Sequence, residues 1–121
     1  MPELPEVETT IRYLDSKVNG KKILSINTSK KKLRKNLHIK NLPVIEGSII
    51  KSVNRKAKYI VLTLKPLRYL VIHLGMSGRL KFFNKKNYTN EKHDHVVMEF
   101  SQFNVVFNDP RRFGMFFLLE D

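Results

Sequence analysis

The hydrophobic positions near the start of the chain follow the period of an α-helix. They come at spacings of four, three and four residues, at Val7, Ile11, Leu14 and Val18. Such spacings place side chains on one face of a helix. Pro5 is typical of a first helical turn, and Gly20 is typical of the position just after the last one. The pattern predicts an amphipathic helix that begins close to Pro5 and ends before Gly20.

The rest of the chain consists of short runs rich in β-branched and aromatic residues, separated by Gly and Pro. We expect strands at Ile23–Thr28, Ser48–Val53, Tyr59–Leu64, Leu70–Leu74, Arg79–Phe83, Val96–Phe100, Asn104–Phe107 and Met115–Leu119. Many short strands at this spacing are typical of a two-layer antiparallel sandwich or a barrel. The pattern predicts one α+β domain over residues 1–121. In it, the N-terminal helix packs on a two-layer antiparallel β-sandwich of about eight strands.

One segment fits neither period. Residues 28–43 are compatible with a basic loop, or with a pair of strands and a helical turn. The run from Lys30 to Lys35 lies inside this segment, and charge runs of this kind are most often solvated. It would add a nonspecific attraction to DNA.

The charge balance narrows the class of partner. The chain has 23 Lys and Arg against 11 Asp and Glu, a net charge of +12. Such an excess favours nucleic acid first and an anionic membrane second, and it argues against a calcium-type acidic protein. The absence of Cys excludes disulfides, a thiolate nucleophile and a Cys-based zinc site.

The sequence also predicts a soluble, cytoplasmic protein. Glu3, Glu6 and Glu8 lie where the basic and apolar parts of a secretory signal would have to be. The longest nonpolar run, Phe113 to Leu119, is far shorter than the ~18 residues that span a bilayer. The lack of Cys fits a reducing compartment.

The N-terminus offers a nucleophile. If Met1 is removed, the nitrogen of Pro2 is a secondary amine, which can attack an electrophilic carbon and form an iminium ion. An α-amino group has a pKa near ~8, so part of it is neutral at physiological pH. Glu3 lies next to it and could donate or accept a proton. The alternative is that Pro2 only assists processing and that Glu3 and Glu6 complement the helix dipole. If Met1 is retained, the Pro2 nitrogen is an unreactive amide.

Two turns place unusual side chains at the surface. Met76 lies between two glycines, which predicts a tight hairpin tip and leaves this Met without a role in the core. Arg111, Arg112 and Phe113 follow an Asp-Pro pair, so that two cations and an aromatic ring project from one turn. Side chains of this kind can fill the space left by an extruded base. The residues alone indicate a basic turn that is compatible with DNA.

The remaining candidates have simple structural alternatives. Lys58 begins an expected strand and could be a solvated cation, while His73 lies in an apolar run, where a buried structural role is more common. His93 and His95 would face the same side of a strand, as a pair of metal ligands can. Two ligands make a poor site and no Cys supports them, so we expect a structural role and no metal.

Five segments, in this order, carry a resemblance to a known family. They read MPELPEVET (1–9), RKAKYI (55–60), IHLGMSG (72–78), KHDHV (92–96) and NDPRRFG (108–114). In sequence and order they resemble the formamidopyrimidine-DNA glycosylases, bifunctional enzymes of base-excision repair. The related endonuclease VIII branch is less similar, because its members usually have Gly where this chain has Leu4.

The resemblance implies a role for each matching residue at the damaged nucleotide. Pro2 would be the nucleophile that attacks the sugar, and Glu3 the acid and base that protonates the ring oxygen and assists the eliminations. Glu6 would lie in the substrate pocket. Lys58 would act beside the catalytic pair through a phosphate next to the lesion, and His73 would contact the DNA backbone.

The resemblance also implies that the turns around Met76 and Arg111 contact the opened duplex. Met76 and Arg111 would fill the void left by the extruded nucleotide, with Arg111 facing the orphaned cytosine. Phe113 would wedge beside them and Arg112 would contact phosphate. The implied substrates are 8-oxoguanine and formamidopyrimidines in double-stranded DNA, followed by β,δ-elimination at the abasic site. The implied enzyme is a monomer associated with the nucleoid.

The resemblance covers only one part of the family's length. Full-length members have a second half with a helix–two-turns–helix module and a four-Cys zinc finger. This chain corresponds to the N-terminal catalytic domain, so we expect no cofactor in it, and weak or absent activity in isolation. The alternatives are a non-catalytic basic DNA-binding module that retains the scaffold, and an unrelated RNA-binding β-domain explained by charge alone.

Overall fold

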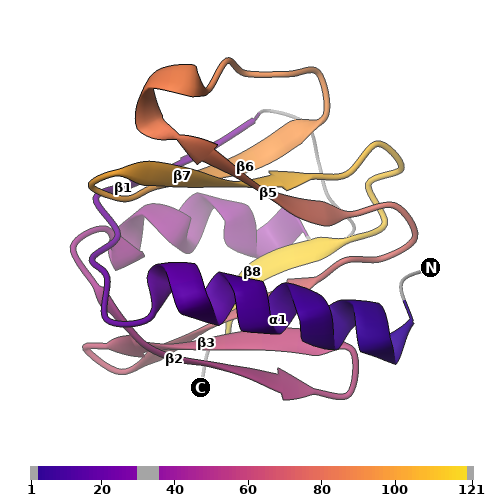
Figure 1. The fold of residues 1–121 in the computed structure, drawn as a ribbon, viewed down its shortest axis with the longest axis horizontal. Coiled ribbons are helices and arrows are strands. Elements are labelled where there is room, and N and C mark those ends of the chain that lie inside the picture. Colours follow the sequence, from indigo (N-terminus) through magenta and orange to yellow (C-terminus); the bar gives the residue numbers. More distant parts are fainter. Residues whose placement is uncertain (1–2, 30–35, 120–121) are drawn as a thin grey trace.

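The computed structural model describes residues 3–29 and 36–119 of the chain. Figure 1 shows the order of its helices and strands. They are α1 (Leu4–Val18), β1 (Ser25–Thr28), the 3-10 helix η1 (Asn36–Ile45), β2 (Ile49–Lys56), β3 (Tyr59–Lys65), β4 (Arg68–His73), β5 (Arg79–Asn84), the 3-10 helix η2 (Lys85–Asn87), β6 (Asp94–Glu99), β7 (Phe103–Asn108) and β8 (Met115–Leu119). The predicted helix and strands are therefore confirmed within the described residues.

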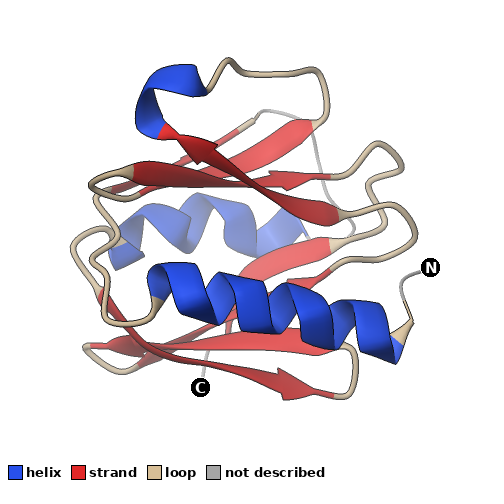
Figure 2. Ribbon diagram, in the orientation of Figure 1, coloured by secondary structure: helices blue, strands red, loops and turns tan. Residues whose placement is uncertain are grey.

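The strands form two layers. One sheet has the order β1-β6-β7-β5 and the other β2-β3-β4-β8, and every neighbouring pair is antiparallel. Figure 2 shows the two sheets stacked, with helices along their sides. This is the predicted two-layer sandwich with an N-terminal helix.

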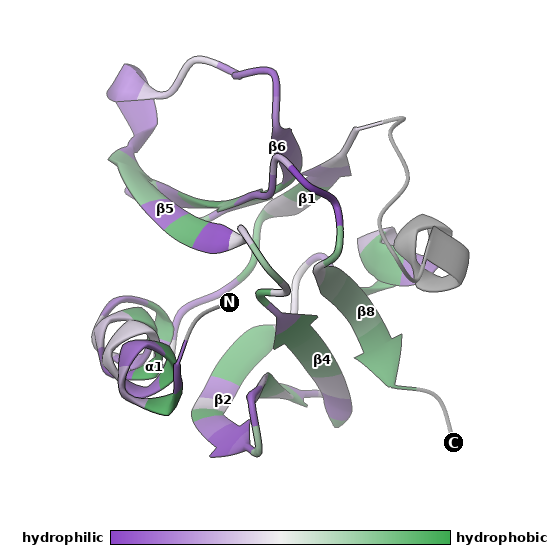
Figure 3. Cartoon of the chain, turned by 90° about the vertical axis from the view of Figure 1, so that its right-hand side faces the viewer, coloured by the Kyte–Doolittle hydropathy of each residue, from purple (hydrophilic) through white to green (hydrophobic). Residues whose placement is uncertain are grey.

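The two long helices close opposite sides of the sandwich. In Figure 3, α1 lies beside β2 and β5. On the other side, η1 contacts β1 and β8. Tyr13 of α1 reaches β5, where its ring contacts Phe82 edge-on with centroids 4.7 Å apart. Each helix thus covers the gap between one edge strand of each sheet, where the core would otherwise meet water.

The predicted helical face points into the core. Val7, Leu14 and Val18 are buried, and Ile11 packs against the same cluster. The helix ends at Val18, and Gly20 follows with a φ of +77°, a conformation that suits Gly at a helix C-terminus. The period of hydrophobic residues is therefore the right guide to this element.

The core lies between the sheets. Phe100, Phe107 and Phe116 are its largest fully buried side chains, surrounded by Ile, Leu and Val from both sheets. Alternate residues of each strand face it, so that Ile72 of β4 pairs directly with Ile60 of β3 and Phe116 of β8. A core of this kind fixes the register of the strands, and with it the position of the loops at their ends.

Some boundaries differ from those predicted. Strand β2 continues to Lys56 because its polar last residues pair with the start of β3 in a hairpin. In residues 28–43, the described part contains most of η1 and no strand beyond Thr28. The run Lys30–Lys35 lies outside the described residues.

None of the helices in the described part of the chain is long and apolar enough to cross a membrane.

Candidate nucleic-acid interface

Strand register brings three loops to one end of the sandwich. Tyr59 pairs with His73, and His73 pairs with Met115, across β3, β4 and β8. These residues adjoin the β2–β3 turn, the loop 74–78 and the loop 109–114, respectively. The three connections therefore lie side by side, at the end of the molecule where α1 begins (Figure 1). We call this end the loop end.

The loop 74–78 touches the loop 109–114 backbone to backbone. Gly75 has a φ of +63°, and a Cβ at this position would lie 2.6 Å from the backbone nitrogen of Gly114 and 2.7 Å from the carbonyl carbon of Phe113. Only Gly combines that conformation with so close an approach. The contact places Met76 next to the loop that carries Phe113.

A buried carboxylate holds the two loops together. Asp109 is completely buried; its Oδ1 accepts a hydrogen bond of 2.7 Å from the hydroxyl of Ser77, and its Oδ2 accepts one of 2.7 Å from the backbone of Gly114. The Ser77 hydroxyl in turn accepts a bond of 3.0 Å from the backbone N–H of Arg111. Both loops are therefore fixed from below, on the side away from solvent.

The side chains above this network are exposed. Met76 is 43% and Phe113 is 45% exposed, and the two apolar side chains lie on neighbouring loops. The guanidinium of Arg111 lies 5.5 Å from the centroid of the Phe113 ring, within range of a cation–π interaction. Arg112 is exposed and has a φ of +58°. The fold thus presents two cations and two apolar side chains on a rigid support.

His73 lies at the edge of this surface. It is half-buried, so the core position that its apolar neighbours favoured is wrong. Its Nδ1 accepts a hydrogen bond of 3.0 Å from the backbone N–H of Gly75, and its ring contacts Tyr59 with centroids 4.9 Å apart. Because Nδ1 is the acceptor, the neutral ring carries its hydrogen on Nε2.

Lys58 also lies at the loop end, but not in a strand. It is the second residue of the β2–β3 turn, and it is half-buried. The predicted strand begins one residue later, at Tyr59. Ala57 precedes Lys58 with a φ of +52°, and its carbonyl accepts a hydrogen bond of 2.7 Å from Arg55. This unusual backbone marks a turn that the β-rich sequence conceals.

The start of α1 reaches the same turn through Arg55. The Nε of Arg55 lies 3.2 Å from Oε1 of Glu8. Glu3 precedes the helix and Glu6 lies in its first turn, and both are exposed. The two carboxylates therefore lie on the helix end that Arg55 joins to the β2–β3 turn. Pro2 lies outside the described residues.

Comparison with known proteins identifies the family. Residues 1–116 match the family described as the formamidopyrimidine-DNA glycosylase N-terminal domain. The chain belongs to this family. It is 40% identical over 121 residues to a formamidopyrimidine-DNA glycosylase of Wolbachia pipientis from Culex pipiens, with 98% of this chain and 44% of the relative covered. A formamidopyrimidine-DNA glycosylase of Zymomonas mobilis is 44% identical over 115 residues, covering 94% of this chain and 42% of the relative.

Solved structures agree in fold. The Lactococcus lactis Fpg in complex with Fapy-dG-containing DNA matches with a TM-score of 0.87 and 33% identity, over 97% of this chain and 44% of that one. The same protein with abasic-site DNA matches with a TM-score of 0.88 and 32% identity, over 98% and 44%. The chain spans less than half the length of these formamidopyrimidine-DNA glycosylases.

The fourth matched segment, KHDHV, supports the loop end of this formamidopyrimidine-DNA glycosylase domain from beneath. His95 is buried; its Nε2 donates a hydrogen bond of 2.7 Å to the carbonyl of Asp109, and its Nδ1 lies 3.5 Å from the Ser29 hydroxyl. His93 precedes β6 in a turn, and its carbonyl accepts a bond of 3.0 Å from the Asp109 backbone. No group of three potential metal ligands occurs among the described residues.

Asp94 of the same segment anchors the loop before β6. Its carboxylate accepts hydrogen bonds from Asn108 (2.8 Å), Tyr88 (3.0 Å) and the backbone of Glu91 (2.9 Å), and Lys81 lies 3.2 Å away. Burial alone would raise the pKa of Asp94, but these bonds outweigh it and lower the pKa. Burial and the neighbouring Asp94 raise the pKa of Tyr88.

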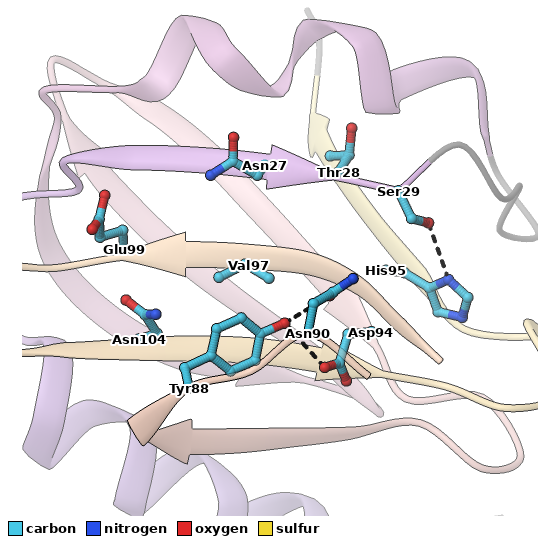
Figure 4. Close-up of a pocket in the computed structure, with 10 residues that line it drawn as sticks. All are labelled: Asn27, Thr28, Ser29, Tyr88, Asn90, Asp94, His95, Val97, Glu99 and Asn104. Atoms are coloured by element: carbon cyan, nitrogen blue, oxygen red, sulfur yellow. Dashed lines mark hydrogen bonds between the residues drawn. The ribbon is translucent and has the colours of Figure 1, made fainter. Parts of the chain in front are cut away.

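These groups line a pocket of about 350 Å³ on the outer face of the sheet β1-β6-β7-β5 (Figure 4). The hydroxyl of Tyr88 also lies 2.8 Å from Oδ1 of Asn90. Glu99 accepts a hydrogen bond from Ser25, and this bond and the nearby Lys85 lower its pKa. Tyr88, Asn90 and Asp94 of the lining bond one another, whereas the buried Oδ1 of Asn104 has no hydrogen-bond partner among the described residues. The pocket does not include the exposed side chains of the loop end.

Sequence reasoning missed several residues that build the site. They are Asp109, Ser77 and Gly114 of the loop network, and the pair Arg55 and Glu8. The Asp-Pro turn was a signal for Asp109, because Asp often bonds the backbone of the turn that follows it. The pair Arg55 and Glu8 is separated by the whole of β1 and η1, and no local pattern connects the two residues.

Proposed function

We propose that this chain is the catalytic half of a DNA repair enzyme that excises 8-oxoguanine and formamidopyrimidines and then cleaves the strand as an abasic-site lyase. The observation that supports this most directly is the gathering of the start of α1, the β2–β3 turn and both loops at one end of the fold. Four of the five matched segments contribute to this end, and the remaining one, KHDHV, packs beneath it through His95.

In this proposal the exposed loops hold the duplex open. Met76 and Arg111 occupy the space of the extruded nucleotide, Arg111 faces the orphaned base, and Phe113 wedges into the stack. The contact between Arg111 and the Phe113 ring and the buried Asp109 beneath them support a rigid wedge. Rigidity matters, because a side chain that moved aside would not offset the cost of unstacking.

The phosphate backbone is held by Lys58, His73 and Arg112. All three lie at the loop end, and the chain carries a net charge of +12. His73 is suited to donate from Nε2, because Gly75 occupies its Nδ1. Lys58 contacts the phosphate next to the lesion, and so places the sugar for attack.

The chemistry begins at Pro2, once Met1 is removed. The Pro2 nitrogen attacks C1′ of the nucleotide with its lone pair while the bond from C1′ to the base breaks. The base leaves with that electron pair and takes up the proton that the nitrogen loses. Glu3 protonates the ring oxygen, so the sugar opens and an iminium remains between Pro2 and C1′. The Glu3 carboxylate then takes a C2′ proton and the 3′ phosphate leaves, and a second elimination expels the 5′ phosphate. Water hydrolyses the remaining iminium and releases the Pro2 amine. Glu6 lines the pocket of the extruded nucleotide.

The substrate class is double-stranded DNA with an oxidised purine or an abasic site. The structural relatives from Lactococcus lactis were crystallised with Fapy-dG-containing and abasic-site DNA, which supports this choice. The proposed steps use only the amine and carboxylates of the chain, with no cofactor. We propose a monomer that acts in the cytoplasm, on the nucleoid.

Borohydride trapping on an abasic duplex tests this function. The sample is protein whose loss of Met1 has been confirmed by intact mass. We expect a covalent adduct that peptide mapping assigns to Pro2, and no adduct at Pro2 in protein that retains Met1, where this nitrogen is an amide. A saturated but untrapped complex would contradict the lyase chemistry.

That second outcome favours the alternative function, a DNA-binding module without catalysis. The chain covers less than half of its relatives, and this leaves room for a domain that binds but does not react. In that case Glu3→Gln would bind abasic DNA with the same affinity as the wild type, and neither protein would form an adduct.

A further inference from the structure

A second basic surface lies at the far end of the sandwich from the loop end. A pocket of about 560 Å³ is open between the last turn of α1 and the turn that joins β6 to β7. Figure 1 shows both of these elements at the end opposite the N-terminus. The proposed contacts to DNA therefore leave this pocket uncovered.

Three lysines form one side of the pocket, Lys17, Lys21 and Lys22. None of them belongs to an ion pair among the described residues. Lys17 is in the last turn of α1, where a cation stabilises the helix end. Lys21 and Lys22 follow the helix, so the helix end does not account for them.

The base of the pocket is apolar. Phe100 is buried and its ring stacks on Phe103, with centroids 4.8 Å apart and planes at 10°. Leu24 is 44% exposed beside them. Lys17 lies 5.8 Å from the Phe103 ring centroid, so one cation is held directly over the apolar base. The pocket combines positive charge at its rim with hydrophobic surface inside.

We propose that this pocket binds an acidic peptide segment of a partner protein. Carboxylates of the segment would pair with Lys17, Lys21 and Lys22, and one aliphatic or aromatic side chain would enter beside Leu24 and Phe103. Charge complementarity selects an acidic partner, and the enclosed apolar base selects one with a hydrophobic side chain.

Nucleic acid fits this pocket less well. Single-stranded nucleic acid binds through bases stacked on open aromatic faces. Here Phe100 and Phe103 stack on each other, and Lys17 lies over Phe103. A phosphate backbone would meet the lysines but leave the apolar base unfilled. The proposal concerns a different end of the molecule from the repair function and does not depend on it.

Fluorescence polarisation with a labelled peptide tests the proposal. The probe is a peptide of several aspartates followed by leucine and phenylalanine. We expect saturable binding that the triple variant K17A/K21A/K22A weakens by about tenfold, since each exposed ion pair contributes modestly. Leu24→Ser should weaken binding severalfold without changing the charge. A peptide with serine in place of its leucine and phenylalanine should bind the wild-type protein as weakly as the original peptide binds Leu24→Ser.

A charge-matched control separates this site from general attraction. The variant K56A/R79A/K86A removes the same charge from exposed positions outside the pocket. It should weaken the peptide less than about twofold, because exposed charges beyond a Debye length are largely screened. Equal losses in the two triple variants would overturn the proposal. So would an undamaged duplex that displaces the peptide from the wild type but not from K17A/K21A/K22A, because the pocket would then bind nucleic acid.

Discussion

Arg55 lies 3.2 Å from Glu8 and so joins helix α1 to the β2–β3 hairpin. The same guanidinium donates a hydrogen bond of 2.7 Å to the carbonyl of Ala57, the residue before Lys58. One side chain therefore sets the distance between the helix end that carries Glu3 and the turn that carries Lys58. In the proposed reaction these two parts act on the sugar and on the adjacent phosphate of one nucleotide.

Arg55→Ala should reduce trapping on abasic DNA more than it reduces stability. An exposed ion pair contributes about 0.2–1 kcal/mol, so the unfolding free energy should fall by no more than that. Misplacement of reacting groups costs far more, and we expect the trapping rate to fall ~10-fold. Glu8→Ala should give a similar loss, and the double variant should be no worse than either single one. If Glu8→Ala has no effect, Arg55 acts on DNA directly and does not position Lys58.

Gly75→Ala should be strongly destabilising. The substitution places a Cβ at a φ of +63° and 2.6 Å from the backbone nitrogen of Gly114. Left-handed backbone costs roughly 1–2 kcal/mol for Ala, and the overlap adds to it, so we expect a loss of about 2–4 kcal/mol. Urea denaturation measures it. Gly20→Ala is the matched control, because Gly20 has a φ of +77° with nothing within 4 Å of a Cβ. Equal losses would mean that the two loops do not touch.

Local patterns predicted the helix and the strands of this domain, but not the contacts that assemble its loop end. The spacing from Val7 to Val18 marks α1, and the β-branched runs mark the strands, because both are periodic along the chain. The contact of Gly75 with Gly114 and the bond from Ser77 to Asp109 join residues far apart in sequence. They exist only once the register of the strands is set.

The candidate site residues rest on the resemblance to a family more than on the physical chemistry of the residues themselves. Met76 and Phe113 are exposed apolar side chains, as their turns predicted. The β-rich run after Lys58 predicts that this residue lies at the start of a strand. It lies in a turn instead, where Ala57 has a positive φ without a Gly to signal the turn. For His73, the apolar neighbours favour a core role and the resemblance implies a contact to the DNA backbone; in the structure it ends its strand and meets the loop.

Acid should destabilise the domain partly through Asp94. Its pKa is lower in the folded state, because the bonds from Asn108 and its other partners outweigh burial. A depressed pKa gives a stabilisation that is complete above the unfolded value, near ~3.9, and that is lost as the pH falls through the folded value. Asp94→Asn should be less stable at neutral pH and should lose less stability on acidification. Thermal melts across this range measure both slopes, and parallel curves would remove Asp94 as a contributor.

Lys58→Ala should weaken binding to damaged and undamaged duplexes alike. A phosphate contact carries no sequence information, so its loss lowers every affinity and reduces the salt slope by about one. Titrations at several salt concentrations measure this slope. Lys86→Ala, at an exposed position in η2, is the control and should leave the slope unchanged. An unchanged slope in Lys58→Ala would mean that this lysine does not contact phosphate.

Unlike Lys58→Ala, Phe113→Ala should weaken binding to damaged DNA and leave binding to undamaged DNA almost unchanged. The ring is 45% exposed and lies beside Arg111, so its removal creates no large cavity in the core. Undamaged duplex should bind nearly as before, with the same salt slope, since no charge is lost. Abasic duplex should bind about tenfold more weakly, because a wedge contributes only when the stack is opened. Leu67→Ala is a matched control, since Leu67 is 69% exposed in the β3–β4 turn, away from the loop end. An equal loss on both duplexes would mean that Phe113 supports the fold of its loop and does not enter the stack.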